Sequence, residues 1–190
     1  MRCEFRDKAD GERCYAVAAR LARSFASSVA TGARAHTVSI DVRQQPRHLP
    51  IYSLCLFTKY QQAVWDFVDI AGGAHLDWIE RCETDVREAH MAAIEMSGQT
   101  PLFQEPEIDR SSIEAALTEH VVPYLTDRIP TVLADGPLRF VDDPEALLGE
   151  VHGMARTTHV RTAIKTLYKQ GIIDSDGTGD FFMTAIALVE

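Results

Sequence analysis

The apolar and polar positions of the last fifty residues alternate between short strand patterns and helical stripes. A short strand pattern occupies 138–141. Asp143 and Pro144 follow it as an N-cap and a proline in the first helical turn, where the missing N–H costs nothing. This short helix has one apolar face, made of Leu147, Leu148 and Val151. The pattern therefore predicts a strand followed by a short helix.

A second helix follows, which Thr157 or Thr158 can cap and which Gly171 ends. Its apolar residues recur at i, i+3, i+4, i+7 and i+8, which indicates one buried stripe. The stripe consists of Val160, Ala163, Ile164, Leu167 and Tyr168. Residues 172–189 then read as a hairpin around the turn 174–180. Strand, helix, turn, helix and hairpin in this order predict a winged helix-turn-helix, whose wing is this hairpin.

The outer face of this second helix is a candidate DNA-binding surface. Residues 151–170 contain four basic residues and no acid, although the whole chain has a formal charge of −9. Basic and hydroxyl side chains on a recognition helix suit phosphates and base edges. The predicted DNA-binding residues are Thr157, Thr158, His159, Arg161, Thr162, Lys165 and Lys169. The alternative is a packing or dimerisation module, which the acidic residues of the wing, Asp174, Asp176 and Asp180, favour because they repel phosphates.

The N-terminal half predicts helices and a β-hairpin. Residues 10–28 are a helix candidate, and 37–42 alternate as a half-buried strand. The apolar run 51–58 has strand length, and we expect it to be covered on both faces and to pair with 37–42.

Two helical regions follow, over 60–70 and 75–96, and we expect Gly72-Gly73 either to kink or to separate them. A proline-containing connector marks a domain boundary. The predicted units are 1–98, an α/β unit; 99–110, the connector; and 111–190, the winged helix-turn-helix. Ser111 or Ser112 is expected to cap the first helix of the last unit, and Pro123 to begin a further helical turn. The predicted fold class is α/β or α+β.

Composition is that of an ordinary globular protein, with 46% apolar and 25% charged residues among 190. The acidic balance restricts any DNA binding to one local face. No run of 18 apolar residues and no apolar signal core occur, so we expect a cytoplasmic protein that does not enter the membrane. Its cysteines are expected to be reduced thiols, at least two of them buried: Cys3, Cys14, Cys55 and Cys82.

The sequence offers little catalytic chemistry. A dinucleotide or methyl-donor site needs a glycine-rich turn after a strand, and neither Gly72-Gly73 nor the glycines of the wing are placed so. His75, Cys82 and His90 share a helix, but zinc needs ligands that converge from more than one element. We therefore expect no cofactor, no metal and no catalytic residue.

The densest aromatic region lies at 52–78, and its spacing suits a core more than a base-stacking platform. Any exposed part would be a protein-binding surface. The candidate partner-binding residues are Tyr52, Tyr60, Trp65 and Trp78.

Part of the chain resembles the three-Cys-motif partner (TcmP) family. The resemblance rests on the strand 50–59, Pro-Ile-Tyr-Ser-Leu-Cys-Leu-Phe-Thr-Lys, on the helix start at 63–67, and on the pattern of 157–171. It covers roughly 12–70 and 110–190 and implies an appended winged helix. Family members carry a Rossmann methyltransferase-like half with a glycine-rich motif, which this chain lacks. The resemblance also implies a prokaryotic origin and a radical-SAM-like protein partner with three cysteines.

Three functions are consistent with these observations. The first is a non-enzymatic accessory protein of the TcmP type that binds a protein partner and, through its winged helix, duplex DNA. The second is a DNA-binding transcriptional regulator. The third is a subunit of an enzyme whose catalytic half lies on another chain.

Overall fold

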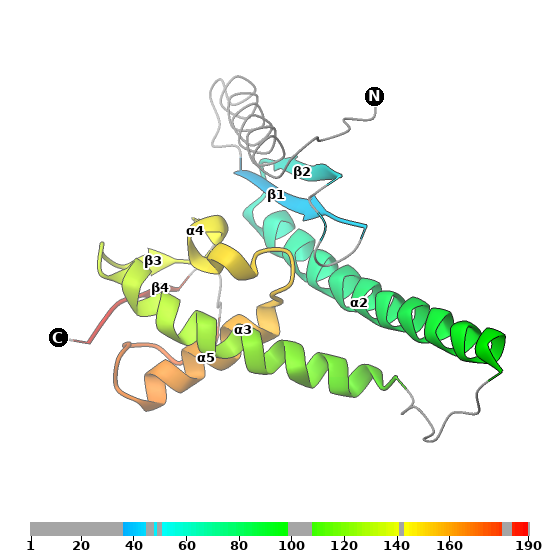
Figure 1. Cartoon of the computed structure of the whole chain (residues 1–190). Coiled ribbons are helices and arrows are strands. Elements are labelled where there is room, and N and C mark those ends of the chain that lie inside the picture. The colour runs from blue at the N-terminus through cyan, green and yellow to red at the C-terminus, as the bar shows by residue number, and fades with distance from the viewer. Residues whose placement is uncertain are drawn as a thin grey trace.

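The computed structural model describes residues 36–44, 48, 51–98, 108–140, 143–179 and 184–189. These residues form a mixed α/β structure in which helices dominate (Figure 1). The predicted helix over 10–28, together with Cys3 and Cys14, lies outside the described residues.

The predicted hairpin is present. β1 (His36–Val42) and β2 (Tyr52–Thr58) pair antiparallel, with Ser39 opposite Cys55. Val38 is fully buried, as expected for a strand that buries one of its two faces. The expectation that the second strand is covered on both faces is wrong, because the side chains of Tyr52 and Leu54 are 58% and 49% exposed.

The region after the hairpin forms one helix. α2 (Gln61–Ser97) has 37 residues and continues through Gly72-Gly73, so the predicted separation into two helices is wrong. A glycine costs a helix interior only about 1 kcal/mol, and packing of the flanking turns offsets it. Gly98, at a φ of 68°, ends the helix in the left-handed conformation that favours glycine.

α3 (Arg110–Leu133) begins two residues earlier than a Ser111 cap would place it, and three residues earlier than a Ser112 cap would. Its N-cap is Asp109, whose carboxylate accepts hydrogen bonds from the backbone N–H and hydroxyl of Ser111 and the hydroxyl of Ser112. The helix also continues through Pro123, where a new helical turn was expected. A regular row of buried residues, Leu117, Val121, Leu125, Ile129 and Leu133, holds the helix in place despite the lost backbone hydrogen bond.

The C-terminal elements follow the predicted order. β3 (Leu138–Arg139) is shorter than expected. α4 (Pro144–Leu148) is capped by Asp143, whose carboxylate accepts from the N–H of Ala146. A 3-10 turn, η1 (Gly149–Val151), leads to α5 (Thr157–Lys169). β4 (Ala185–Ile186) pairs antiparallel with β3, and Ile173 forms an antiparallel bridge with Leu188.

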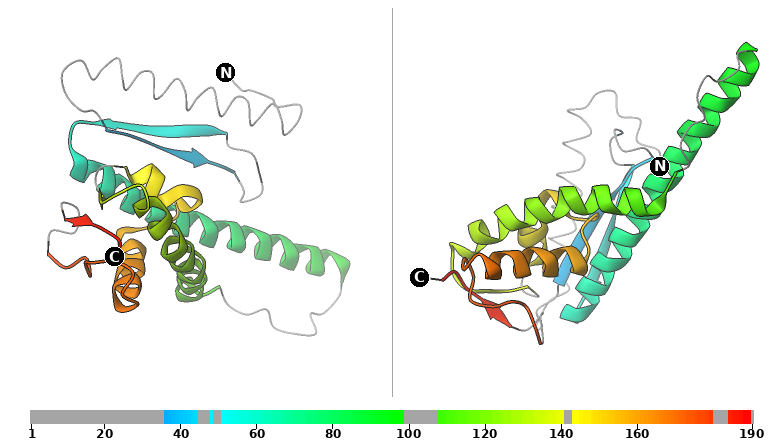
Figure 2. Two further views of the ribbon diagram at one scale, coloured as in Figure 1. Left: turned by 90° about the vertical axis from the view of Figure 1, so that its left-hand side faces the viewer. Right: turned by 90° about the horizontal axis from the view of Figure 1, so that it is seen from below.

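One hydrophobic cluster joins the two halves of the described chain. Trp65 and Val68 of α2 are fully buried in the same cluster as Val121 of α3 and Ile164 of α5. α3 and α5 run side by side, and α2 crosses them before extending beyond the rest of the described structure (Figures 1 and 2). Within the described residues, no helix combines the length and the apolar character that a membrane crossing requires.

Candidate functional site

The candidate site is α5 together with the polar contacts at its first turn. The apolar stripe of this helix is buried as predicted, with Val160, Ala163, Ile164 and Leu167 at most 1% exposed, and the helix packs against α3. Tyr168, expected in the stripe, is 47% exposed. It lies about 80° around the helix from Val160 at 100° per residue, which places it at the edge of the stripe.

The predicted DNA-binding residues divide into an exposed and a buried group. The side chains of Thr158, Thr162, Lys165 and Lys169 are exposed. Arg161 is half-buried, and its guanidinium donates to the carbonyl oxygen of Gly177 at 3.4 Å. Thr157 and His159 are only 8% and 6% exposed, so their expected place on the outer face is wrong.

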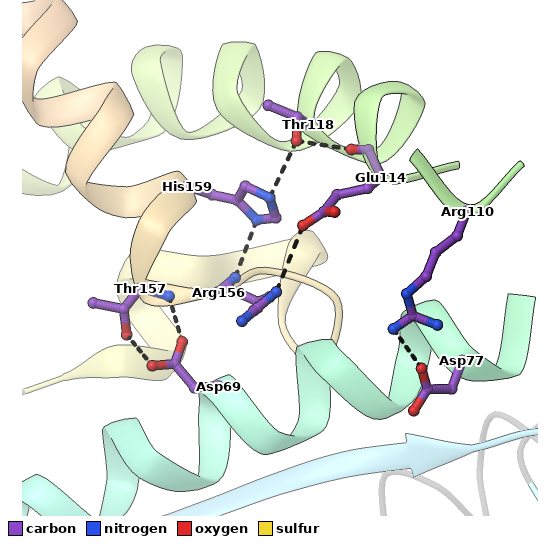
Figure 3. A network of polar contacts seen from close by, with 8 residues as sticks. All are labelled: Asp69, Asp77, Arg110, Glu114, Thr118, Arg156, Thr157 and His159. Carbon is purple, nitrogen blue, oxygen red and sulfur yellow. Dashed lines mark hydrogen bonds and ion pairs between the residues drawn. The ribbon is translucent and has the colours of Figure 1, made fainter. Parts of the chain in front are cut away.

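Thr157 is buried because α2 lies against the first turn of α5. The Asp69 carboxylate of α2 accepts from the Thr157 backbone N–H at 2.6 Å and from its hydroxyl at 2.8 Å (Figure 3). The carboxylate thus takes the place of an N-cap side chain and puts a negative charge at the positive end of the helix. In helix-turn-helix proteins the first turn of the recognition helix contacts base edges. In this chain the first turn of α5 is instead hydrogen-bonded to α2.

His159 is buried because its ring bonds back to its own helix start and across to α3. Its Nδ1 accepts from the backbone N–H of Arg156 at 3.1 Å, the reciprocal half of a capping box. The neutral ring then carries its proton on Nε2, which lies 3.4 Å from the Thr118 hydroxyl oxygen (Figure 3). Burial lowers the pKa of His159, and the positive charge of Arg156 lowers it further against the smaller opposing effects of Glu114 and Asp69.

Gly72 permits the close contact between α2 and the segment before α5. A Cβ at this position would lie 2.5 Å from Cγ of Arg156 and 2.7 Å from the carbonyl oxygen of Ala155. At Gly73 an added Cβ would meet nothing within 4 Å. The Gly72-Gly73 pair, rejected above as a cofactor turn, therefore serves helix packing at its first glycine.

Two arginines complete this junction of three helices. Arg156 lies 3.6 Å from the Glu114 carboxylate of α3. Arg110, at the start of α3, forms ion pairs with Asp77 of α2 (Figure 3) and with Glu80 of the same helix. Sequence reasoning missed Asp69 and Glu114 because each partner lies on a different helix, and no local pattern connects them.

The turn at 174–179, predicted to be a wing, places the acidic side chain of Asp176 near Lys165 of α5. The Asp174 carboxylate accepts from the N–H of Ala187, so it links this turn to the C-terminal segment. Asp176 accepts from the N–H and hydroxyl of Thr178, which lower its pKa, and Lys165 lowers it slightly more. The third predicted acid, Asp180, lies outside the described residues.

The candidate partner-binding residues also divide. Tyr52 and Tyr60 are 58% and 76% exposed. Trp65 is fully buried in the core, so its predicted role as a partner-binding residue is wrong. Trp78 is half-buried beside His75, with ring centroids 5.3 Å apart.

The described residues contain no group of three or more histidine, cysteine or acidic side chains placed to hold a metal ion. Cys55 and Cys82 are free and half-buried, and burial raises the pKa of the Cys55 thiol.

Comparison of the chain with protein-family models, curated proteins and solved structures gives no match.

Proposed function

We propose that residues 108–189 form a winged helix-turn-helix and that the chain is an accessory protein that binds duplex DNA through the exposed face of α5. The order α3, β3, α4, α5, β4 supports this proposal. The strand pairings support it as well, because β4 pairs antiparallel with β3 and Leu188 pairs antiparallel with Ile173. The C-terminal segment therefore lies between two segments that precede it in the chain. α5 then takes the place of the recognition helix.

One observation carries the proposal: the exposed face of α5 is free of acid. Thr158, Thr162, Lys165 and Lys169 are spaced by four, three and four residues, so they share one side of the helix. No acidic residue occurs between Glu150 and Asp174. Lysines contact backbone phosphates and release counterions, while hydroxyls donate to phosphate oxygens.

The geometry favours binding that depends little on sequence. Because Asp69 holds the first turn of α5 and His159 is buried, fewer side chains of that turn can meet base edges. Asp176 lies near Lys165 and reduces the attraction of that lysine for phosphate. We therefore expect weak, salt-sensitive binding to mixed-sequence duplex.

Fluorescence anisotropy with a labelled duplex of mixed sequence tests this proposal. Lys165→Glu combined with Lys169→Glu should abolish binding at low salt without changing thermal stability, because both side chains are exposed. Lys59→Glu reverses the charge of an exposed lysine before α2 and serves as the matched control. Equal loss of binding in the control, or no binding by the unaltered protein, would refute the proposal.

A second candidate function is binding of a protein partner of the TcmP type. The observation that favours it is the exposure of Tyr52, Leu54 and Tyr60 on β2 and the turn that follows. Exposed aromatic side chains are common at protein interfaces. Co-purification with a co-expressed three-cysteine radical-SAM-like protein should be lost in a Tyr52→Ser, Tyr60→Ser variant. Retention of the complex in that variant would exclude this surface.

A further inference from the structure

The outer half of α2 carries an exposed apolar seam that continues from its buried half. The seam residues recur with alternating spacings of three and four, which is the heptad pattern of paired helices. They are Ile79, Cys82, Val86, Ala89, Ala93 and Met96. The six consecutive heptad positions contain no charged residue.

The seam belongs to the face of α2 that already packs inside the molecule. The same spacing runs back from Ile79 through position 75 to Gly72, Val68 and Trp65. Trp65 and Val68 are fully buried in the core. The helix therefore presents one continuous packing face, whose first half is covered by α3 and α5.

The second half of this face is half-buried at Ile79 and Cys82 and exposed from Val86 onward. The buried residues of α2 all lie between Val64 and Leu76. Beyond them, Val86 is 69% and Met96 is 90% exposed, and this part of the helix extends past the rest of the described structure (Figures 1 and 2). Most helical stability in proteins comes from packing of an amphipathic face, and none of the residues of α2 beyond Leu76 is fully buried by the described part of the chain.

We propose that the seam pairs with the same seam of a second copy of this chain, antiparallel, in a two-fold symmetric dimer. The symmetry axis lies between Val86 and Ala89, so that each of these residues lies opposite the other across the seam. Cys82 then faces Ala93, and Ile79 faces Met96. A single surface patch that is complementary to itself is what a two-fold interface requires.

Side-chain size and charge both select this arrangement. The antiparallel register sets a small alanine against the larger Val86 and against Cys82, which gives layers of similar volume. A parallel, in-register pair would instead set alanine against alanine at 89 and 93 and leave gaps in the seam. Two acidic residues flank the seam, one on each side. In the antiparallel register the flanking Glu83 faces His90 of the second copy and the flanking Asp85 faces Ala92, so neither meets another acid. Opposed helix dipoles also favour the antiparallel pair.

Sedimentation equilibrium of the full chain tests the dimer. Val86→Glu would bury an unpaired charge at the centre of the seam and should weaken dimerisation by roughly a hundredfold or more. Ala74→Glu adds the same charge to an exposed position of α2 outside the seam and should leave the dimer unchanged. A monomer at all attainable concentrations, or a dimer that Val86→Glu leaves intact, would overturn the proposal.

A crosslink tests the register and does not depend on how Val86→Glu folds. In an Ala93→Cys variant, mild oxidation with oxidised glutathione should join Cys82 of one copy to the introduced thiol of the other. Mass spectrometry of the crosslinked peptides identifies the pair. A crosslink between two Cys82 thiols, or no crosslink between these peptides, would contradict the antiparallel seam.

Discussion

Asp69 and Thr157, 88 positions apart, are joined by two hydrogen bonds that attach the first turn of α5 to α2. The carboxylate accepts from both the backbone N–H and the hydroxyl of Thr157, a residue that is 8% exposed. The position of α5, and of the exposed face on its far side, therefore depends on a residue outside the predicted winged helix.

Asp69→Ala should destabilise the chain by about 1–3 kcal/mol, because the buried N–H of Thr157 loses its partner and the helix loses its cap. Asp66→Ala, one turn earlier on the exposed side of α2, should cost under about 0.5 kcal/mol. Urea denaturation of both variants measures the difference. Equal losses of stability would show that the Asp69–Thr157 contact contributes nothing beyond surface electrostatics.

His159 predicts a dependence of stability on pH. Its pKa is lowered in the folded chain, so below the ordinary value of about 6.5 the unfolded chain takes up a proton that the folded chain resists. The free energy of unfolding should therefore fall as the pH drops below that value, until the lowered pKa is reached. His159→Gln keeps an acceptor for the Arg156 N–H but does not titrate, and it should reduce this fall.

The control for His159 is His120→Gln, which changes an exposed histidine of α3. Thermal unfolding as a function of pH should give the unaltered slope in this variant. His75 and His152, whose pKa values burial also lowers, keep part of the acid sensitivity in all three proteins. If the stability of His159→Gln follows that of the unaltered protein at every pH, the lowered pKa of His159 makes no contribution to the acid sensitivity of the fold.

Leu167 and Lys169 provide a direct test of the phase of α5. Leu167 is 1% exposed, and Leu167→Ala should cost about 2–5 kcal/mol through lost burial and the cavity that remains. Lys169 is exposed, and Lys169→Ala should cost under about 0.5 kcal/mol. Thermal or chemical denaturation measures both costs. A larger effect at Lys169 would reverse the assigned faces of the helix and remove the basis for its DNA contact.

The two adjacent glycines of α2 should respond in opposite directions to alanine. Gly72→Ala places a methyl group against Arg156 and the Ala155 carbonyl, so α2 and the start of α5 must separate and stability should fall. Gly73→Ala meets nothing within 4 Å and should stabilise the helix by about 0.5–1 kcal/mol. A gain of stability in both variants would show that Gly72 serves no close contact.

Local pattern was enough to predict the hairpin pairing, the short helix from Pro144 and the buried stripe of α5. Each of these rests on alternation, capping or helical periodicity within a few residues. The unbroken α2 and α3 were not predicted, because local breakers such as Gly72 and Pro123 are outweighed by packing against distant elements.

The candidate site was predicted only where it faces solvent. Lys165 and Lys169 follow from helix phase alone. The burial of Thr157 and His159 does not, because it results from contacts with Asp69 on α2 and Thr118 on α3. Their polar character indicated an outer face, whereas the fold satisfies their polar atoms at a junction of three helices.

The salt dependence of DNA affinity tests the central claim most directly. The affinity of the unaltered chain for a mixed-sequence duplex is measured by anisotropy over a series of salt concentrations. Phosphate contacts by Lys165 and Lys169 predict a slope of log K against log salt of about −2, close to −0.9 for each contact. Affinity that does not change with salt, or no binding at low salt, would contradict the assignment of α5 as a DNA-binding helix.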